Sequence, residues 1–148
     1  MTQQTLKLFI SAGESSGDDL GGRVLKALRT LYPGRLEVQG VGGPSLAREG
    51  MTSLFPMSDL AVMGLVEVVP HIPKLRRRIL ETVTAIERFQ PDVLLTIDAP
   101  GFNKRVVSRL RNPNPAMVKV HYVAPTVWAW REGRVHTFKR LFDALLCL

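Results

Sequence analysis

The fold class is decided by one stretch of sequence, Asp92-Val93-Leu94-Leu95-Thr96-Ile97-Asp98, which is the strongest strand signal in the chain. A short apolar run of this kind is typical of a strand that is covered on both faces of a parallel sheet. A second run, Leu6-Lys7-Leu8-Phe9-Ile10-Ser11-Ala12, has the same character and is closed by Gly13. We therefore expect both runs to be buried strands of one sheet.

Outward from these runs, strand and helix patterns alternate. The expected strands cover residues 6–12, 36–41, 52–55, 92–98, 118–123 and 143–148, and the last of them is expected to be buried. The expected helices, indicated by apolar stripes such as Leu20, Val24, Leu28 and Leu31, cover residues 20–31, 45–49, 73–89, 103–111 and 133–142. Residues 59–71 fit neither period. The alternation predicts an α/β, Rossmann-like domain, with a mostly parallel sheet and helices on both faces.

The composition is that of one globular domain. The 148 residues are 45% hydrophobic and 22% charged, and they carry a formal net charge of +7, which favours an anionic partner. The single cysteine, Cys147, excludes an intrachain disulfide framework, and the scattered histidines lack metal-ligand spacing, so we expect no metal and no other cofactor. No apolar run is long enough for a membrane span and no signal peptide is evident, which predicts a cytoplasmic protein.

The first candidate site is the loop Gly13-Glu14-Ser15-Ser16-Gly17-Asp18, because ligands of such folds bind at the carboxyl ends of the strands. Glycines permit close approach of a ligand to the backbone, and the amides of the following helix attract an anion. The loop matches neither the dinucleotide pattern G-x-G-x-x-G nor a P-loop. The alternative is a purely structural helix start, capped by Ser15 or Ser16 and favoured by Asp18 and Asp19.

Asp98 is the second candidate, since it directly follows the decisive strand. A carboxylate there could be partly desolvated, which would raise its pKa and make it a usable general base. Alternatively, Asp98 simply caps the helix that begins after Ala99-Pro100-Gly101.

The third candidate is the loop over residues 124–131. It contains Trp128 and Trp130, followed by Arg131, a set that can stack on a sugar or base and hold a phosphate. The alternative is that the two indoles pack over the end of the sheet. His121, on the preceding expected strand, is interpreted as a hydrogen-bonded core residue.

Four segments together resemble one family, the lipid-A-disaccharide synthases. In chain order they are Gly13-Glu14-Ser15-Ser16-Gly17-Asp18, Ala61-Val62-Met63-Gly64-Leu65-Val66-Glu67-Val68, Ile97-Asp98-Ala99-Pro100-Gly101-Phe102-Asn103 and His121-Tyr122-Val123-Ala124-Pro125-Thr126-Val127-Trp128-Ala129-Trp130-Arg131. Their order is that of the family, and they span nearly the whole chain. The last segment is the most specific of the four, because of its two tryptophans.

The resemblance implies the N-terminal half of a two-domain, B-type glycosyltransferase. Residues 1–148 would form the acceptor-side domain, and the C-terminal, UDP-binding domain is absent. The implied reaction joins UDP-diacylglucosamine to diacylglucosamine 1-phosphate, with inversion and without a metal, and forms lipid A disaccharide 1-phosphate and UDP. The chain also ends on an apolar strand, which suggests a fragment, so we expect it to be inactive alone.

The same resemblance implies roles for individual residues. Asp98 becomes the expected general base, and Glu14 is the second candidate for that role. The residues expected to bind substrate are Gly13, Ser15, Ser16, Gly17, Asp18, Asn103, Trp128, Trp130 and Arg131.

A membrane-facing or acyl-binding segment is expected between Val66 and Arg78. Apolar side chains there adjoin a cluster of positive charge: Val66, Val68, Val69, Ile72, Leu75, Arg76, Arg77 and Arg78. Apolar insertion combined with attraction to anionic headgroups holds a peripheral protein on a bilayer. The helix dipole opposes cations at a helix start, so an external anion would stabilise these arginines. With the resemblance, this predicts a peripheral location on the inner membrane; the alternative is ordinary core beside a solvated basic rim.

Two other functions compete with this one. The chain could be a stand-alone lipid- or phosphate-binding module without catalysis. Nucleic-acid binding rests on charge alone and is disfavoured, because the aromatic residues do not lie in RNP-like strands.

Overall fold

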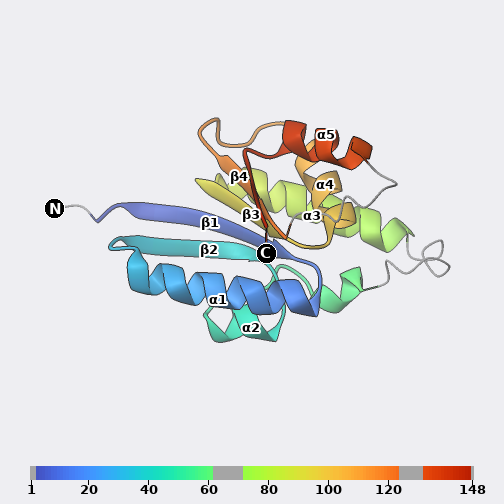
Figure 1. Cartoon of the computed structure of the whole chain (residues 1–148). Helices are drawn as coiled ribbons and strands as arrows, with labels where there is room; N and C mark the ends of the chain where they lie inside the picture. The colour runs from blue at the N-terminus through green and yellow to red at the C-terminus, as the bar shows by residue number, and fades with distance from the viewer. Residues whose placement is uncertain (1–2, 62–71, 124–131, 148) are drawn as a thin grey trace.

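A five-stranded parallel sheet forms the centre of the chain in a computed structural model, which describes residues 3–61, 72–123 and 132–147 (Figure 1). The strands are β1 (Thr5–Ala12), β2 (Arg35–Val41), β3 (Val93–Ile97), β4 (Val118–Tyr122) and β5 (Ala144–Leu146). Their order across the sheet is β2-β1-β3-β4-β5. The two strands that anchor the sequence prediction, β1 and β3, are neighbours, with Leu8 opposite Val93.

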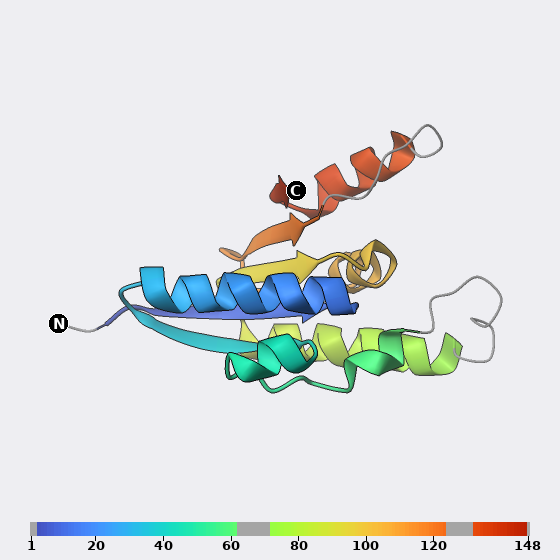
Figure 2. The same cartoon turned by 60° about the horizontal axis from the view of Figure 1, so that its bottom comes forward.

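Helices cover both faces of this sheet. On one face lie α1 (Ser15–Leu31) and the short α2 (Pro44–Arg48), and on the other lie α3 (Ile72–Phe89), α4 (Pro100–Ser108) and α5 (Glu132–Leu141) (Figure 1). Figure 2 shows α1 running alongside the central strands. A 3-10 helix, η1 (Met57–Leu60), precedes α3 in the chain. The predicted α/β, Rossmann-like fold with helices on both faces is confirmed.

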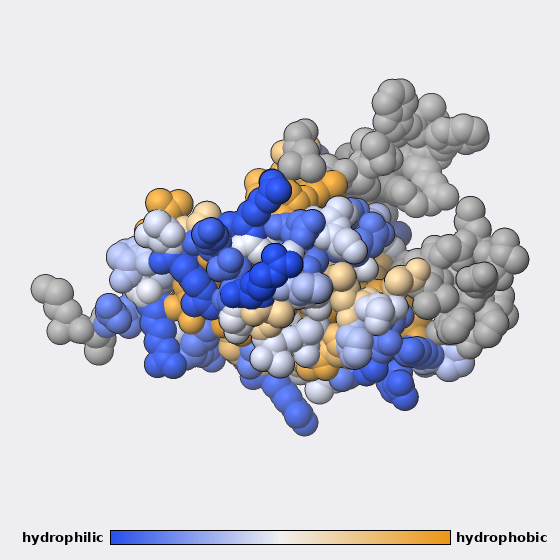
Figure 3. Space-filling view, turned by 90° about the horizontal axis from the view of Figure 1, so that it is seen from below, coloured by the Kyte–Doolittle hydropathy of each residue, from blue (hydrophilic) through white to orange (hydrophobic). Residues whose placement is uncertain are grey.

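The core consists of two layers, one on each face of the sheet. Alternate residues of a strand point to opposite faces, so Phe9 packs into the layer under α3, α4 and α5, whereas Leu8 and Ile10 pack into the layer under α1 and α2. Phe9 and Ile10, one from each layer, are almost completely buried. The outer surface over α1 and α2 is mostly hydrophilic (Figure 3). This division explains why apolar residues follow one another in β1 without alternation.

Two of the expected strands differ from the structure. Residues 52–55 form no strand; only Ser53 makes a bridge, to Gly40. The Ser53 hydroxyl accepts from the Gly42 amide and donates to the Phe55 carbonyl, and such local side-chain bonds compete with a strand ladder. The last strand is not buried, because β5 has three residues and is paired with β4 alone, and Leu145 and Leu146 are exposed.

Two helices also differ from their expected limits. The helix expected over residues 103–111 starts earlier, at Pro100, because proline suits the first helical turn, and it ends at Ser108. The helix expected from residue 20 already starts at Ser15 and ends before Pro33, as predicted. Leu31, the last residue of the apolar stripe that predicts this helix, is 78% exposed.

Candidate functional site

The candidate site lies where the strand order reverses. The chain leaves β1 for β2 on one side, and β3 pairs on the other side of β1, which makes the carboxyl ends of β1 and β3 the switch point at which open α/β sheets bind ligands. Gly13 follows β1 and Asp98 follows β3. A side chain at Gly13 would place its Cβ 2.7 Å from the Cβ of Ala99, so only glycine allows the two loops to meet there.

Asp98 is held in a strained turn. Asp98 and Ala99 both adopt the left-handed conformation, with φ of 50° and 42°, and each such non-glycine residue costs about 1–2 kcal/mol. The Asp98 amide donates to the Tyr122 carbonyl (3.0 Å), and the Ser16 hydroxyl donates to the Asp98 carboxylate (3.2 Å). The alternative that Asp98 caps α4 is wrong, because Ala99 occupies the cap position and no side chain caps the helix.

Asn103 links this turn to β1 through two side-chain hydrogen bonds. Its side-chain amide donates to the Asp98 carbonyl (2.8 Å), and its carbonyl oxygen accepts from the Ser11 hydroxyl (2.6 Å). Asn103 and Ser11 are both fully buried. The sequence predicts that Asn103 binds substrate; in the structure both polar ends of its side chain form hydrogen bonds within the chain. The sequence analysis missed Ser11, which looked like one more residue of a buried strand.

A cavity of about 710 Å³ opens beside this turn. The residues that line it come from the start of α1 and from η1: Gly13, Glu14, Ser15, Ser16, Met57, Ser58, Leu60 and Ala61. Its volume falls in the range of small-molecule sites. Three of the expected substrate-binding residues, Gly13, Ser15 and Ser16, line this cavity together with Glu14. The η1 wall was not predicted from the sequence.

The start of α1 is open towards this cavity. Glu14 is the extended residue at the cap position, and no side chain caps the helix. Ser15 and Ser16 lie inside the first turn, so the alternative that one of them caps α1 is wrong. The first amides of a helix lack partners within it and, with the dipole, favour a negatively charged ligand.

Asp18 does not face the cavity, although it was expected to bind substrate. It is 2% exposed and accepts hydrogen bonds from the backbone amides of Gly43 (2.8 Å), Ser45 (2.8 Å) and Leu46 (3.1 Å). These amides belong to the start of α2, so Asp18 caps a helix other than its own. Gly17 is also structural: its Cβ would lie 3.2 Å from the Ile97 carbonyl, where α1 packs on β3.

His121 is a core residue, as interpreted. It is fully buried, its Nδ1 lies 2.7 Å from the Thr96 hydroxyl, and its ring contacts both Phe138 and Phe142, with ring centres 5.0 and 5.2 Å away. Burial lowers the pKa of His121 to about 4, and the negative charge of Asp98 and a hydrogen bond with the Val123 backbone act in the opposite direction. The imidazole is therefore neutral at pH 7.

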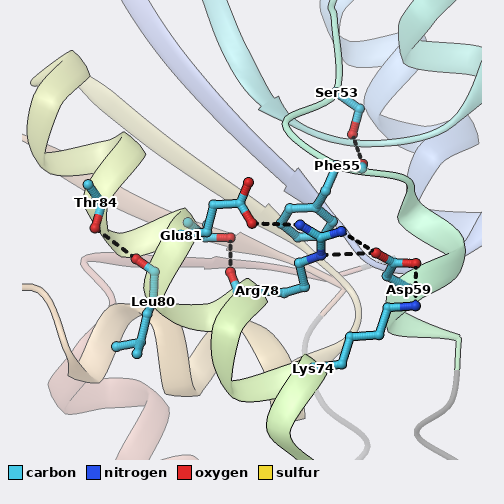
Figure 4. Close-up of polar contacts among 9 residues, drawn as sticks. Ser53, Phe55, Asp59, Lys74, Arg78, Leu80, Glu81 and Thr84 are labelled. Carbon is cyan, nitrogen blue, oxygen red and sulfur yellow. Dashed lines mark hydrogen bonds and ion pairs between the residues drawn. The ribbon is translucent and has the colours of Figure 1, made fainter. Parts of the chain in front are cut away.

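Some of the expected membrane-facing residues are exposed in the structure, and others pack or pair within the chain. Ile72 is 49% exposed and Arg76 and Arg77 are exposed, whereas Leu75 packs against the core. Arg78 turns inward and pairs with Asp59 and Glu81 (Figure 4). The expectation that an external anion balances Arg78 is therefore corrected, because two carboxylates of the chain already do so.

Several expected site residues lie outside the described residues, namely Trp128, Trp130, Arg131, Val66, Val68 and Val69. Within the described ranges, no helix is long and apolar enough to cross a membrane. The same ranges contain no group of three or more His, Cys, Asp or Glu side chains that could hold a metal ion.

The fold and the candidate site together define a class: a Rossmann-like α/β domain with a candidate ligand site at the switch point of its sheet. Within that class, the chain belongs to the lipid-A-disaccharide synthetase family, whose model matches residues 8–148. It is 49% identical over 141 residues to a lipid-A-disaccharide synthase of Paramagnetospirillum magneticum, a match that covers 95% of this chain and 36% of that protein. It is 50% identical over 143 residues to the synthase of Rhodospirillum centenum, with 97% and 36% covered. The chain thus spans about a third of the length of these relatives.

Proposed function

We propose that this chain is the acceptor-side, N-terminal domain of a glycosyltransferase that joins UDP-diacylglucosamine to diacylglucosamine 1-phosphate. The products are lipid A disaccharide 1-phosphate and UDP. The observation that carries the proposal is the Asp98 carboxylate, fixed by Ser16 at the switch point beside a cavity of about 710 Å³. The names and coverage of the relatives support the same assignment.

In the proposed mechanism, Asp98 is the general base of an inverting transfer. Its carboxylate takes the proton from the attacking hydroxyl of the acceptor, whose oxygen then bonds to the anomeric carbon of the donor. The bond from that carbon to the UDP oxygen breaks, and UDP leaves with the electron pair. Glu14, exposed at the cavity wall, is the second candidate for the base, or it orients a sugar hydroxyl.

The leaving diphosphate needs electrostatic stabilisation that this chain is not expected to supply. We assign that role to the C-terminal, UDP-binding domain implied by the resemblance, and the transfer would proceed without a metal or cofactor. It follows that the chain folds and binds the acceptor but does not transfer sugar alone.

The test is to incubate the isolated chain with each substrate in detergent micelles. Saturable binding of diacylglucosamine 1-phosphate, weak binding of UDP and no disaccharide product would support the proposal. Turnover close to that of a complete synthase would contradict the proposal that the C-terminal domain is needed to stabilise the leaving group. A chain that naturally acts alone as a lipid- or phosphate-binding module would bind the acceptor equally well, but adding the C-terminal domain would not restore transfer.

Contact with an anionic membrane is proposed for the start of α3. Ile72, Arg76 and Arg77 are exposed there, and no ion pair of the described residues involves either arginine. Each basic residue near an anionic bilayer contributes about 1 kcal/mol of attraction. This attraction would hold the chain at the cytoplasmic face of the inner membrane, where it could reach its lipid substrates.

The membrane proposal is tested with vesicles that contain anionic lipid. Arg76→Glu with Arg77→Glu should abolish the preference for such vesicles, and Val68→Ser with Val69→Ser should weaken binding and improve solubility. Arg23→Glu with Lys26→Glu, an equal charge change on exposed residues of α1, is the matched control. If the valine pair lowers the melting temperature strongly and leaves vesicle binding intact, those valines are core and the assignment fails.

A further inference from the structure

The first turns of α3 are tied to η1 by ion pairs that converge on one carboxylate, Asp59 (Figure 4). Lys74 Nζ lies 2.9 Å from Asp59 Oδ1. Arg78 donates from Nε (2.9 Å) and from Nη2 (2.7 Å) to Asp59 Oδ2. Both oxygens of the carboxylate are thus engaged by cations from α3. We call Asp59, Lys74 and Arg78 the η1 clamp.

The Arg78 side chain makes two further contacts besides its bonds to Asp59. Its Nη1 donates to Glu81 (2.7 Å), and its guanidinium lies 4.8 Å from the ring centre of Phe55. Phe55 in turn packs edge to face with Phe102, in the first turn of α4 after Asp98, with the ring centres 6.5 Å apart. The side chains of Asp59 and Arg78 are only 12% and 17% exposed, unlike an ordinary surface pair. Hydrogen bonds and charge from Lys74 and Arg78 lower the pKa of Asp59, which stabilises its ionised form.

The clamp matters because η1 is one wall of the cavity. Met57, Ser58, Leu60 and Ala61 line it opposite the start of α1. η1 is only four residues long, and at its two ends the Asp59 amide donates to the Pro56 carbonyl (3.0 Å) and the Ala61 amide to the Ser58 carbonyl (3.1 Å). So short a 3-10 helix has little stability alone. Its position therefore depends on what its side chains are attached to. Figure 2 shows η1 next to the start of α3.

We infer that Asp59, Lys74 and Arg78 are positioning residues that hold the η1 wall in place and keep the cavity formed before its ligand arrives. They do not touch the reacting atoms. A wall that is in place in every molecule raises the apparent affinity, because binding does not have to select a minor conformation. Only the identity of the ligand, diacylglucosamine 1-phosphate, rests on the proposed function. The inference that these residues hold η1 in place does not depend on it.

The first experiment measures the wall without any ligand, by hydrogen exchange of the Asp59 and Ala61 amides in the intact chain. Asp59→Asn keeps the shape of the side chain and removes its charge, and it should accelerate both amides about tenfold or more while amides of β1 and β3 are unchanged. Glu37→Gln is the matched control, since it removes the carboxylate of an exposed pair with Arg35 on β2 (3.7 Å). Unchanged exchange at Asp59 and Ala61 in Asp59→Asn would overturn the inference, whatever the chain binds.

The second experiment measures the dissociation constant for diacylglucosamine 1-phosphate in micelles. If the wall is competent in about a tenth of the Asp59→Asn molecules, the dissociation constant rises about tenfold. Lys74→Met should act in the same direction, and Lys74→Arg, which keeps a cationic donor, should restore the wild-type value. Faster exchange with unchanged affinity would overturn the positioning role. Faster exchange in a chain whose wild type does not bind this lipid would instead refute the proposed function and leave the clamp as the support of the wall.

Discussion

Two aspartates near the switch point, Asp18 and Asp98, look alike in the sequence and differ in the structure. Asp18 accepts three backbone amides and is 2% exposed, so its carboxylate is saturated. Asp98 accepts one side-chain hydroxyl, from Ser16, and is half-buried beside the cavity. A carboxylate with free lone pairs at a ligand site can move a proton, whereas a saturated one stabilises the fold. The proximity of an acid to the end of a strand is therefore not sufficient evidence for catalysis.

The largest expected effect is on Asp98. In a complete synthase whose N-terminal third is this chain, Asp98→Asn should lower kcat by about 10²–10⁴-fold, because the general base is lost. The melting temperature should stay within a few degrees, since asparagine tolerates the left-handed conformation that φ of 50° requires. An unchanged kcat, or a variant that merely unfolds, would indicate that Asp98 has a structural role, as Asp18 does, and is not the general base.

The next effect, on Asp18, falls on stability. Asp18→Ala leaves the amides of Gly43, Ser45 and Leu46 without their acceptor at the start of α2. Because hydrogen bonds to a charged group are each worth about 1.5–3 kcal/mol and compensation by water is partial, we expect the free energy of unfolding to fall by about 2–4 kcal/mol. Urea unfolding followed by circular dichroism measures this. A loss below about 0.5 kcal/mol, the range of ordinary surface substitutions, would mean that Asp18 is not the cap of α2.

Asn103 should give a smaller and mixed effect, because it links the fold to Asp98. Asn103→Ala removes the donor to the Asp98 carbonyl and the acceptor of the Ser11 hydroxyl. We expect a loss of about 1–3 kcal/mol in unfolding free energy, and a fall in kcat greater than instability explains, since the left-handed turn is less well held. Ser11→Ala, which keeps the bond to Asp98, is the matched control. Equal kcat values for the two variants would contradict a positioning role for Asn103.

The sequence predicted the strands that form the sheet, because β1 and β3 are buried on both faces and their apolar runs are unbroken. It also placed Gly13, Glu14, Ser16 and Asp98 near one site, since parallel strands end at the same edge. It did not predict the role of Asp18, whose partners lie 25 to 28 residues further along the chain. A cap supplied by another helix has no local pattern.

The η1 clamp was beyond sequence analysis for the same reason. Asp59 lies in a segment with no clear period, and Arg78 lies 19 residues further on in a helix whose other arginines are exposed. The pattern Arg76-Arg77-Arg78 therefore suggested one basic cluster, although Arg78 is paired within the chain and the other two are exposed. Only the fold distinguishes the arginine that is paired within the chain from the two that face outward.

The smallest expected effect uses His121 to report the charge of Asp98. The pKa of His121 is about 4 in the folded chain and about 6.5 when unfolded, so between these values the unfolded chain binds a proton that the folded chain does not. Stability should accordingly fall as the pH is lowered from about 6.5 to about 4, and this contribution should level off below that. The carboxylate of Asp98 favours the protonated imidazole and holds the pKa of His121 higher than burial alone would.

Replacing Asp98 and Asp18 in turn should have different effects on the pKa of His121. Asp98→Asn removes the favourable charge, so the pKa of His121 should fall further below its wild-type value and the acid-sensitive window should extend to lower pH. Asp18→Asn should leave the titration unchanged, because Asp18 is not among the groups that act on His121. NMR of the imidazole proton across the pH range in which the chain remains folded measures both. An equal response to the two substitutions would show that Asp98 is not the charged neighbour of His121, and the distinction between a free and a saturated carboxylate would lose its most direct physical support.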